Sequence, residues 1–269
     1  MQVGAPNERW MPPRWNGAEV TLAEPASARD LEQARRLGIG VTDRRDPTAW
    51  QLVRSKGNLE VHGPLPDAIR LALDLRAGPM ARRLRSSRRD EPLPRAIGVA
   101  RRSAPLSVVD ATAGLCRDAM VLTHLGCEVD ALERIPALVM LVLGAIENSA
   151  LAARLRVVAT DAVPWLQGLT QEQRPAVVYL DPMFSESGSA QVKKDMQVCR
   201  ALVGPPDDPL PLFLAARRAA RERVVVKRHR DLAPIAEGVS FAVVGSRIRF
   251  DVYLAAADPG RTVSETRAP

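Results

Sequence analysis

The chain has 269 residues, 46% of them apolar, and a formal net charge of +7, which fits one large domain or a medium domain with a small companion. Its three cysteines form no paired spacing, which argues against a disulfide framework and a zinc site, and its longest apolar run, Ala137 to Ile146, is too short to cross a bilayer. We therefore expect a cytoplasmic protein with no metal and no membrane contact.

The first third of the chain predicts a small α+β domain over residues 18–80, preceded by a flexible N-terminus at residues 1–17. Ser27 suits the N-cap position of a helix that Gly38 ends. Two β-prone runs on either side of Ser-Lys-Gly resemble a hairpin. The predicted elements are a helix at 27–37, hairpin strands at 50–54 and 58–62, and a second helix at 66–76.

Arginine is concentrated between residues 76 and 102, a segment with nine arginines and only two acids, Asp90 and Glu91. A concentrated cationic segment attracts polyphosphate, although a solvated arginine-rich surface has the same composition. We interpret residues 81–104 as a basic connector. The candidate polyphosphate ligands in it are Arg82, Arg83, Arg85, Arg88 and Arg89.

Strand and helix patterns alternate over residues 105–257, before a flexible tail at 258–269. Five short strands bounded by helices imply a parallel sheet with crossovers, and the last two strands are so close, with only Gly245 and Ser246 between them, that they have to form a hairpin. A parallel sheet that closes with one antiparallel hairpin predicts an α/β, Rossmann-like class I S-adenosylmethionine (SAM) methyltransferase fold. The predicted strands are 106–110, 128–132, 155–159, 176–180, 223–227, 239–244 and 247–254, and the predicted helices are 117–125, 137–150, 162–168, 190–202, 211–221 and 231–237.

An acid ends or follows four strands of this predicted sheet. Ligands of such sheets bind beyond the carboxyl ends of the strands, so a series of acids there indicates a binding site, although polar loops after strands are common. The four acids are Asp110, Glu133, Asp161 and Asp181.

The turn after the first strand, Asp110-Ala-Thr-Ala-Gly114, contains small residues, which let the backbone approach a ligand closely. Arg117 and Asp118 open the next helix, where free N–H groups and the helix dipole favour an anionic group. The less favoured alternative for Asp118 is an ordinary acid of a helix N-terminus. The turn lacks the G-x-G-x-x-G spacing, which counts against NAD and FAD.

Glu133 and Asp161 are candidate ligands for a nucleoside. Glu133 lies 23 residues after Asp110, where a carboxylate accepts hydrogen bonds from ribose hydroxyls; the alternative is a solvated acid at a strand end. Asp161 could accept a hydrogen bond from an adenine amino group, and Ala162 offers its backbone N–H. Asp161 also suits a helix N-cap, so both interpretations stay open.

The segment Asp181-Pro-Met-Phe184 predicts chemistry on a planar amine. The lone pair of such an amine is delocalised into its ring, and a carboxylate and a backbone carbonyl that accept its N–H bonds can direct that lone pair at a sulfonium methyl. Pro182 fixes φ and so holds the neighbouring carbonyls, and Phe184 can stack on a flat base. The alternative is a proline turn with Phe184 in the core.

Cations downstream of this segment are candidate phosphate ligands. Lys193 and Lys194 follow it, and Lys227 and Arg228 lie at the end of the strand predicted at 223–227. A solvated helix face is the alternative for Lys193.

These motifs together resemble the RsmJ family, the bacterial 16S (small-subunit) ribosomal RNA guanine-N2 methyltransferases. The resemblance implies SAM as cofactor, small-subunit rRNA or the 30S particle as partner, and SAM binding by Arg117–Asp118, Glu133–Arg134, Asp161–Ala162 and Asp181. The segments that carry it are Val-Asp-Ala-Thr-Ala-Gly-Leu (109–115), Arg-Asp (117–118), Leu-Glu-Arg (132–134), Val-Val-Tyr-Leu-Asp-Pro-Met-Phe (177–184), Val-Lys-Lys (192–194), Leu-Val-Gly-Pro (202–205), Arg-Val-Val-Val-Lys-Arg (223–228) and Arg-Phe-Asp-Val-Tyr (249–253).

Two alternatives remain open at this point. A catalytically silent RNA-binding or assembly factor on the same fold is one, because Cys116 stands where the family has glycine in the cofactor turn. An N-methyltransferase for DNA adenine or protein glutamine is the other, since those enzymes use similar proline-aromatic loops. Met183, in place of the second proline of such loops, argues against it.

Overall fold

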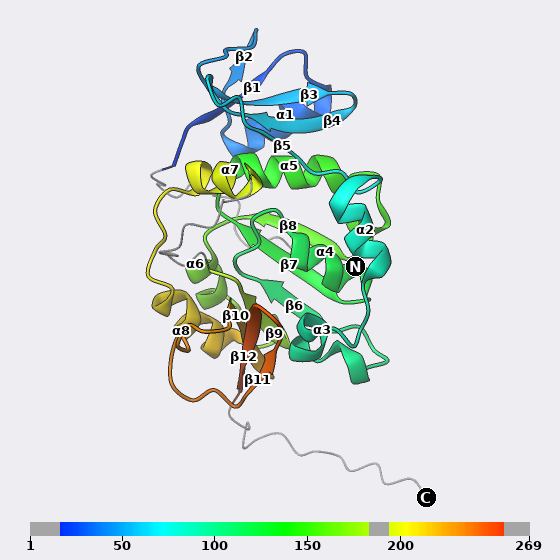
Figure 1. Cartoon of the computed structure of the whole chain (residues 1–269), viewed down its shortest axis with the longest axis vertical. Helices are drawn as coiled ribbons and strands as arrows, with labels where there is room; N and C mark the ends of the chain where they lie inside the picture. Colours follow the sequence, from blue (N-terminus) through cyan, green and yellow to red (C-terminus); the bar gives the residue numbers. More distant parts are fainter. Residues whose placement is uncertain (1–16, 183–193, 256–269) are drawn as a thin grey trace, which may run out of the picture.

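The computed structural model describes residues 17–182 and 194–255, which form two β-sheets with helices between and around them (Figure 1). A five-stranded sheet built from N-terminal residues lies at one end of the molecule. A seven-stranded sheet organises the rest of the described chain. In these described ranges, no helix is both long and apolar enough to span a membrane.

The N-terminal sheet has the strand order β2-β1-β3-β4-β5 and carries one helix, α1. The predicted cap is present, because the Ser27 hydroxyl accepts the Asp30 N–H at 3.1 Å and Gly38 ends the helix with φ at 69°. Asp30, which is buried, also pairs with Arg54 at 2.6 and 2.7 Å, and this pair fixes α1 against β3. The elements are β1 (Val20–Ala23), α1 (Ala28–Leu37), β2 (Val41–Thr42), β3 (Trp50–Ser55), β4 (Asn58–His62) and β5 (Arg70–Ala72).

The helix predicted at residues 66–76 is wrong, because this segment contains β5, which pairs antiparallel with β4. Leu71 and Leu73 are buried, whereas Arg70, which precedes them, and Ala72, which lies between them, are exposed. This two-residue alternation is the pattern of a strand with one buried face. The pairing with β4 therefore decides the conformation.

The seven-stranded sheet has the order β11-β12-β10-β9-β6-β7-β8. Strands β10, β9, β6, β7 and β8 run parallel, while β12 pairs antiparallel with both β10 and β11. The predicted parallel sheet with a terminal antiparallel hairpin is thus confirmed. The strands are β6 (Ser107–Asp110), β7 (Glu128–Glu133), β8 (Leu155–Ala159), β9 (Val177–Leu180), β10 (Arg223–His229), β11 (Phe241–Val244) and β12 (Ile248–Leu254).

Helices follow the parallel strands at close to the predicted positions, with one exception. Residues 231–237, predicted as a helix, form turns and bends, because Pro234 in the middle has no N–H to donate and cannot sit inside a helix. The helical elements are α4 (Arg117–His124), α5 (Pro136–Ile146), η2 (Ala150–Ala153), α6 (Ala162–Gln167), α7 (Lys194–Val203) and α8 (Leu210–Ala219).

The basic segment contains two further helices, α2 (Gly78–Ser86) and α3 (Pro92–Ile97), and the short turn η1 (Val99–Arg101). Helix α2 packs on α4, and α3 packs on the β11–β12 hairpin. This segment therefore forms part of the packed structure and is not an extended linker.

Two hydrophobic clusters cover the two faces of the large sheet, as alternation along β9 shows. Val177 and Tyr179 belong to the cluster that includes Met120 of α4, and Val178 and Leu180 belong to the cluster under α6 and α8. All four β9 side chains are at most 1% exposed, so this central strand is buried on both faces, as expected for a parallel sheet.

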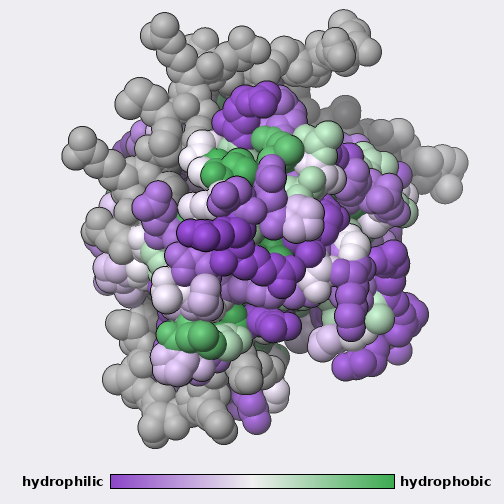
Figure 2. All heavy atoms as spheres, turned by 90° about the horizontal axis from the view of Figure 1, so that it is seen from above, coloured by the Kyte–Doolittle hydropathy of each residue, from purple (hydrophilic) through white to green (hydrophobic). Residues whose placement is uncertain are grey.

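Helix α5 is apolar all round because it is covered on both sides. It packs on β7 and β8 of the large sheet and on β4 of the N-terminal sheet (Figure 1). Leu59 of β4 and Leu138 of α5 belong to one continuous cluster, which joins the two sheets into a shared core. The outer face of the molecule at the N-terminal end is mostly hydrophilic, with small apolar patches (Figure 2).

Candidate active site

The four acids predicted at strand ends lie along one edge of the large sheet. Their strands, β9, β6, β7 and β8, are parallel neighbours in this order, so their carboxyl ends meet there. Asp110 ends β6, Glu133 ends β7, and Asp161 and Asp181 follow β8 and β9. This edge is the candidate active site.

A side-chain hydrogen bond connects the turn after β6 to the end of β9. The Thr112 hydroxyl accepts the backbone N–H of Asp181 at 2.6 Å, and the backbone N–H of Ala111 donates to the Tyr179 carbonyl at 3.0 Å. The two sequence segments with the strongest chemical signal are therefore joined directly, which fixes the position from which the Asp181 side chain extends.

Glu133 connects the same turn to the end of β7. Its carboxylate accepts the Gly114 N–H at 2.8 Å and the Ile135 N–H at 2.7 Å, and the residue is only 8% exposed. Burial raises the pKa of Glu133, and these two backbone hydrogen bonds oppose the rise. Glu133 thus holds Gly114 in place, and a carboxylate oxygen can accept a further bond from a ligand hydroxyl.

The backbone at Gly114 is open to a ligand. Its φ is +52°, a conformation that favours glycine, and no described atom lies within 4 Å of the position that a Cβ would take. Cys116, two residues on, also has a positive φ of 54° and is buried at the start of α4. A non-glycine residue is strained in this left-handed conformation.

Lys227 brings together two of the predicted acids. Its ammonium lies 2.9 Å from Asp118 Oδ2 and 2.8 Å from Asp181 Oδ2. The Tyr179 hydroxyl donates to the same Asp118 oxygen at 2.6 Å. Burial alone would lower the pKa of Lys227, but the two carboxylates outweigh it and raise that pKa above its ordinary value. Lys227 is therefore a cation at every physiological pH.

Asp110 adds a third carboxylate to this group. It is 2% exposed, and burial raises its pKa well above the ordinary value; Asp118 and Asp181 raise it further, while the Thr112 N–H bond and Lys227 oppose the shift. Asp181 is more accessible, with 40% of its side chain exposed. Burial and Asp118 raise the pKa of Asp181, whereas Lys227 lowers it.

The other predicted cofactor residues line the same edge in different ways. Asp161 caps α6 by accepting the Val163 N–H at 2.8 Å, as the capping interpretation predicts, and Ala162 is the first residue of that helix. Arg134 pairs with Asp207 in the loop before α8. Arg117 is the first residue of α4.

The predicted phosphate ligands are divided between paired and exposed residues. Three of the connector arginines bind within the protein: Arg83 pairs with Glu91, Arg88 with Asp90, and Arg89 donates to two backbone carbonyls. Arg82 and Arg85 are exposed on α2, and Arg228 is half-buried on β10. Phe184 and Lys193 lie outside the described residues, as does the side chain of Lys194, and Pro182 is the last residue described before that gap.

Several site residues were not identified from the sequence. Thr112 belongs to the turn predicted from its small residues, and no role was predicted for Tyr179. A tyrosine in a buried strand needs a partner for its hydroxyl, and that requirement is the signal that could have identified Tyr179. Arg247 is a further cation that was not identified from the sequence. It is exposed and lies beside Arg230 of the cationic run that ends β10, where the Arg230 N–H donates to the Arg247 carbonyl at 2.9 Å. Only the register of the β10–β12 pair brings them together.

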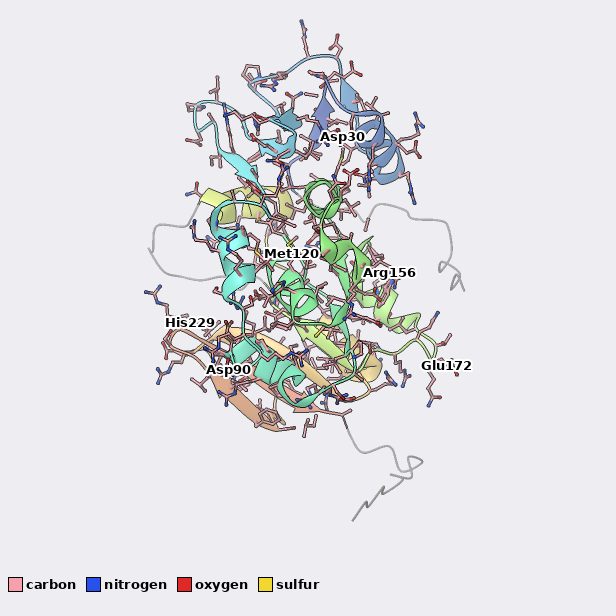
Figure 3. The ribbon with its side chains drawn as sticks, turned by 90° about the vertical axis from the view of Figure 1, so that its right-hand side faces the viewer. Asp30, Asp90, Met120, Arg156, Glu172 and His229 are labelled. Carbon is pink, nitrogen blue, oxygen red and sulfur yellow. The ribbon has the colours of Figure 1, made fainter. Side chains whose placement is uncertain are left out.

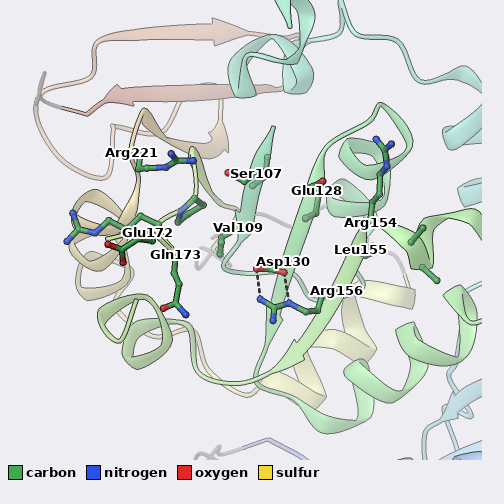
Figure 4. Close-up of a pocket in the computed structure, with 16 residues that line it drawn as sticks. Ser107, Val109, Glu128, Asp130, Arg154, Leu155, Arg156, Glu172, Gln173 and Arg221 are labelled. Carbon is green, nitrogen blue, oxygen red and sulfur yellow. Dashed lines mark hydrogen bonds and ion pairs between the residues drawn. The ribbon is translucent and has the colours of Figure 1, made fainter. Parts of the chain in front are cut away.

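A cavity of about 510 Å³ lies at the opposite edge of the sheet, by the amino ends of β6, β7 and β8 (Figure 4). Figure 3 shows Arg156 and Glu172, which line this cavity, on one side of the molecule and His229 on the other. Arg156 is held by Asp130 through two bonds of 2.7 Å. This edge carries none of the strand-end acids described above, so it is not the candidate active site.

Comparisons with known proteins show the family and the fold to which the chain belongs. A family model described as "Putative SAM-dependent methyltransferase" matches residues 33–255. The chain is 39% identical over 245 residues to the ribosomal RNA small subunit methyltransferase J of Alkalilimnicola ehrlichii, which covers 86% of this chain and 91% of that protein. The protein of the same name from Chromohalobacter salexigens is 39% identical over 251 residues, 88% of this chain and 96% of that one.

Some relatives match over a shorter segment. The Chromobacterium violaceum protein of the same name is 45% identical over 157 residues, so that the match spans 61% of its length and 55% of this chain. Among solved structures, a SAM-dependent methyltransferase from Neisseria gonorrhoeae has a TM-score of 0.70 at 27% identity, and the match covers 89% of this chain and 97% of that one. This likeness confirms the predicted methyltransferase fold.

Proposed function

Because the chain belongs to the ribosomal RNA small subunit methyltransferase J family, we propose that it transfers a methyl group from SAM to small-subunit (16S) rRNA in the cytoplasm. The finer proposal is that the acceptor is the exocyclic N2 of a guanine, in naked rRNA or in the 30S particle. The observation that carries it is the accessible Asp181 carboxylate at the end of β9, held next to a turn that is open to a nucleoside cofactor.

The residues at this edge fit the cofactor. Gly114 leaves room for close approach of a ligand to the backbone, and Glu133 has a fixed carboxylate for ribose hydroxyls. We expect Asp161 and Ala162, at the start of α6, to bind the adenine, and Arg117 and Asp118, at the start of α4, to bind the charged end of the methionine part. When bound, SAM supplies a methyl group on a cationic sulfonium.

Asp181 is the residue that meets the substrate amine. Lys227 engages Asp181 Oδ2, so Oδ1 is the oxygen that the hydrogen bonds of the described residues leave for a substrate N–H. When Asp181 Oδ1 and the Pro182 carbonyl accept the N–H bonds of the substrate amine, they direct the nitrogen lone pair away from the ring plane and toward the methyl group. Positioning in this way lowers the barrier without covalent chemistry on the protein, and the proton leaves late, to Asp181 or to water.

For the rRNA contacts we propose cations on α2 and at the carboxyl end of β10. Arg82 and Arg85 are exposed on α2, and Arg228 is half-buried on β10. Lys193 and Lys194 stay in this proposal, and Phe184 is proposed to stack on the base; the positions of these three side chains lie outside the described residues. Arg230 and Arg247 join them because they lie at the carboxyl end of β10, the strand next to Asp181.

A radiolabelled methyl assay on 30S particles and on naked 16S rRNA tests this function, followed by nucleoside analysis of the product. We expect label in N2-methylguanosine from at least one of the two substrates. Absence of label in both, with S-adenosylhomocysteine binding intact by calorimetry, would reject the proposal and favour a silent RNA-binding factor. Label recovered only in DNA adenine or protein glutamine would reject it in favour of those substrates.

A further inference from the structure

We propose that Lys227 is a positioning residue of this site, whose ammonium holds the carboxylates of Asp118 and Asp181 together and keeps Asp181 ionised and oriented toward the substrate amine. The inference deepens the proposed methyl transfer and rests on it. From the sequence, Lys227 is a candidate phosphate ligand because it lies in a cationic cluster. The present proposal gives Lys227 a different role.

Strand register places Lys227 beside Asp181. Val226 of β10 pairs with Leu180 of β9, so the next residue on each strand, Lys227 and Asp181, lies in the adjacent pair of positions. Side chains alternate across a sheet, so these two residues share a face with Tyr179, two positions before Asp181. Tyr179 faces the cluster that contains α4, and α4 is the helix that presents Asp118.

The contacts of Lys227 restrict the orientation of the Asp118 and Asp181 carboxylates. The ammonium is 2.8 Å from Asp181 Oδ2 and 2.9 Å from Asp118 Oδ2, and only 23% of the Lys227 side chain is exposed. Asp118 Oδ2 also accepts the hydroxyl of Tyr179, which is 1% exposed. Asp118 is thus fixed from two sides, and through Lys227 it fixes Asp181.

A phosphate contact by the same ammonium is unfavourable. Turning Lys227 outward would remove the shared partner of two partly buried carboxylates, which would then repel each other and Asp110 nearby. The positive charge of Lys227 therefore balances the acids of the site. Arg230, at the end of the same strand, is exposed and can reach a phosphate without leaving a carboxylate unpaired.

The pairing also controls the protonation of Asp181. Among the residues that the structure describes, the groups that interact with Asp181 include Lys227 from β10, Asp118 from α4, Asp110 from β6 and Tyr179 from its own strand. Of these four, Lys227 is the cation and the other three are acids. Removing Lys227 therefore raises the pKa of Asp181, and a protonated Asp181 accepts a substrate N–H poorly.

The test compares K227M and K227Q, which are both neutral, with K227R, which keeps the charge, and with R230Q, a matched variant of the exposed cation on the same strand end. Steady-state methyl transfer to the rRNA substrate is measured across pH at saturating SAM. For K227M and K227Q we expect kcat to fall by about tenfold or more, KM for rRNA to stay within about threefold, and the acid limb of the pH profile to move up by about one unit or more.

The control variants are expected to behave differently. K227R should recover part of kcat and return the acid limb toward the wild-type position. R230Q should raise KM for rRNA and reduce its salt dependence without moving the acid limb. If K227M instead raised KM and flattened the salt dependence, with the acid limb unmoved, Lys227 would be a phosphate ligand and the proposal would be overturned.

A readout independent of activity separates this inference from the proposed function. Carbonyl-labelled aspartate NMR measures the carboxyl pKa values in wild-type protein and in K227Q, and we expect the Asp181 signal to titrate at a higher pH in K227Q. If the wild-type protein methylated no rRNA, the function would fail while this titration still decided the role of Lys227. Unchanged carboxyl titration in a folded K227Q would overturn the role itself.

Discussion

The Thr112 hydroxyl accepts the Asp181 N–H at 2.6 Å, across 69 residues of sequence, and so connects the turn after β6 to the residue that we propose contacts the substrate amine. This bond fixes the turn after β6 and the end of β9 relative to each other. A shift of the turn moves Asp181 as well, and methyl transfer depends on such positions to a fraction of an ångström.

Replacing Thr112 tests this coupling. T112V keeps the shape of the side chain but leaves the Asp181 N–H without its acceptor, which costs about 1–3 kcal/mol when the group is buried. We expect kcat for methyl transfer to fall by about tenfold, with S-adenosylhomocysteine affinity changed less than about threefold. T112S retains the hydroxyl and is the matched control; equal kcat in T112V and T112S would show that the bond does not position Asp181.

Removing the Asp181 carboxylate is expected to abolish methyl transfer. D181A loses the acceptor for the substrate N–H, a loss of about 10²–10⁴ in kcat for a group of this kind. The fold should be retained, because the Asp181 side chain is 40% exposed. The matched control is D231A, which removes an exposed acid near the end of β10. Transfer by D181A at the rate of D231A would exclude Asp181 from the reaction.

The positive φ of Cys116 predicts an order of stability among its variants. C116A and C116G both lose the thiol, but only glycine adopts φ near +54° without strain. C116G should therefore be more stable than C116A by about 1 kcal/mol, measured by urea denaturation. A more stable C116A would mean that the turn relaxes out of the left-handed region.

Asp110 should make the stability of the protein depend on pH. The pKa of Asp110 is higher in the folded protein than in the unfolded protein, where it is about 4. Ionisation of Asp110 therefore lowers the stability of the wild-type protein as the pH rises from the unfolded pKa to the folded pKa. D110N carries no charge and lacks this loss. The difference in Tm between D110N and wild type should increase in favour of D110N as the pH rises from about 4 toward the folded pKa of Asp110. A constant difference would place the ionised carboxylate in a favourable environment.

The exposed arginines of α2 are expected to contribute to rRNA affinity. The double variant R82Q/R85Q should weaken rRNA binding and reduce the slope of log K against log salt by about 1.5, for two phosphate contacts. R35Q/R36Q removes two cations from α1, in the N-terminal sheet layer away from the strand-end acids, and serves as the control. Equal slopes for the two double variants would assign Arg82 and Arg85 to solvated surface.

The local sequence pattern was sufficient to predict most of the strands and helices of the fold. Apolar runs and the two-residue gap after Val244 predict the parallel strands and the terminal hairpin, because strand length and crossover length leave few alternatives. The helices expected at 66–76 and 231–237 were wrong, because the first segment pairs with β4 and the second contains Pro234. Pairing with a distant strand is not visible in a short window of sequence.

The sequence by itself determined which acids gather at the site, since parallel strands bring Asp110, Glu133 and Asp181 to one edge whatever the details of packing. Only the tertiary structure decided how they are paired. The side chain of Lys227 lies between Asp118 and Asp181 because of the register of β10 on β9 and the placement of α4 over the sheet. A one-residue slip would turn Lys227 to the other face, so its partners follow from long-range packing.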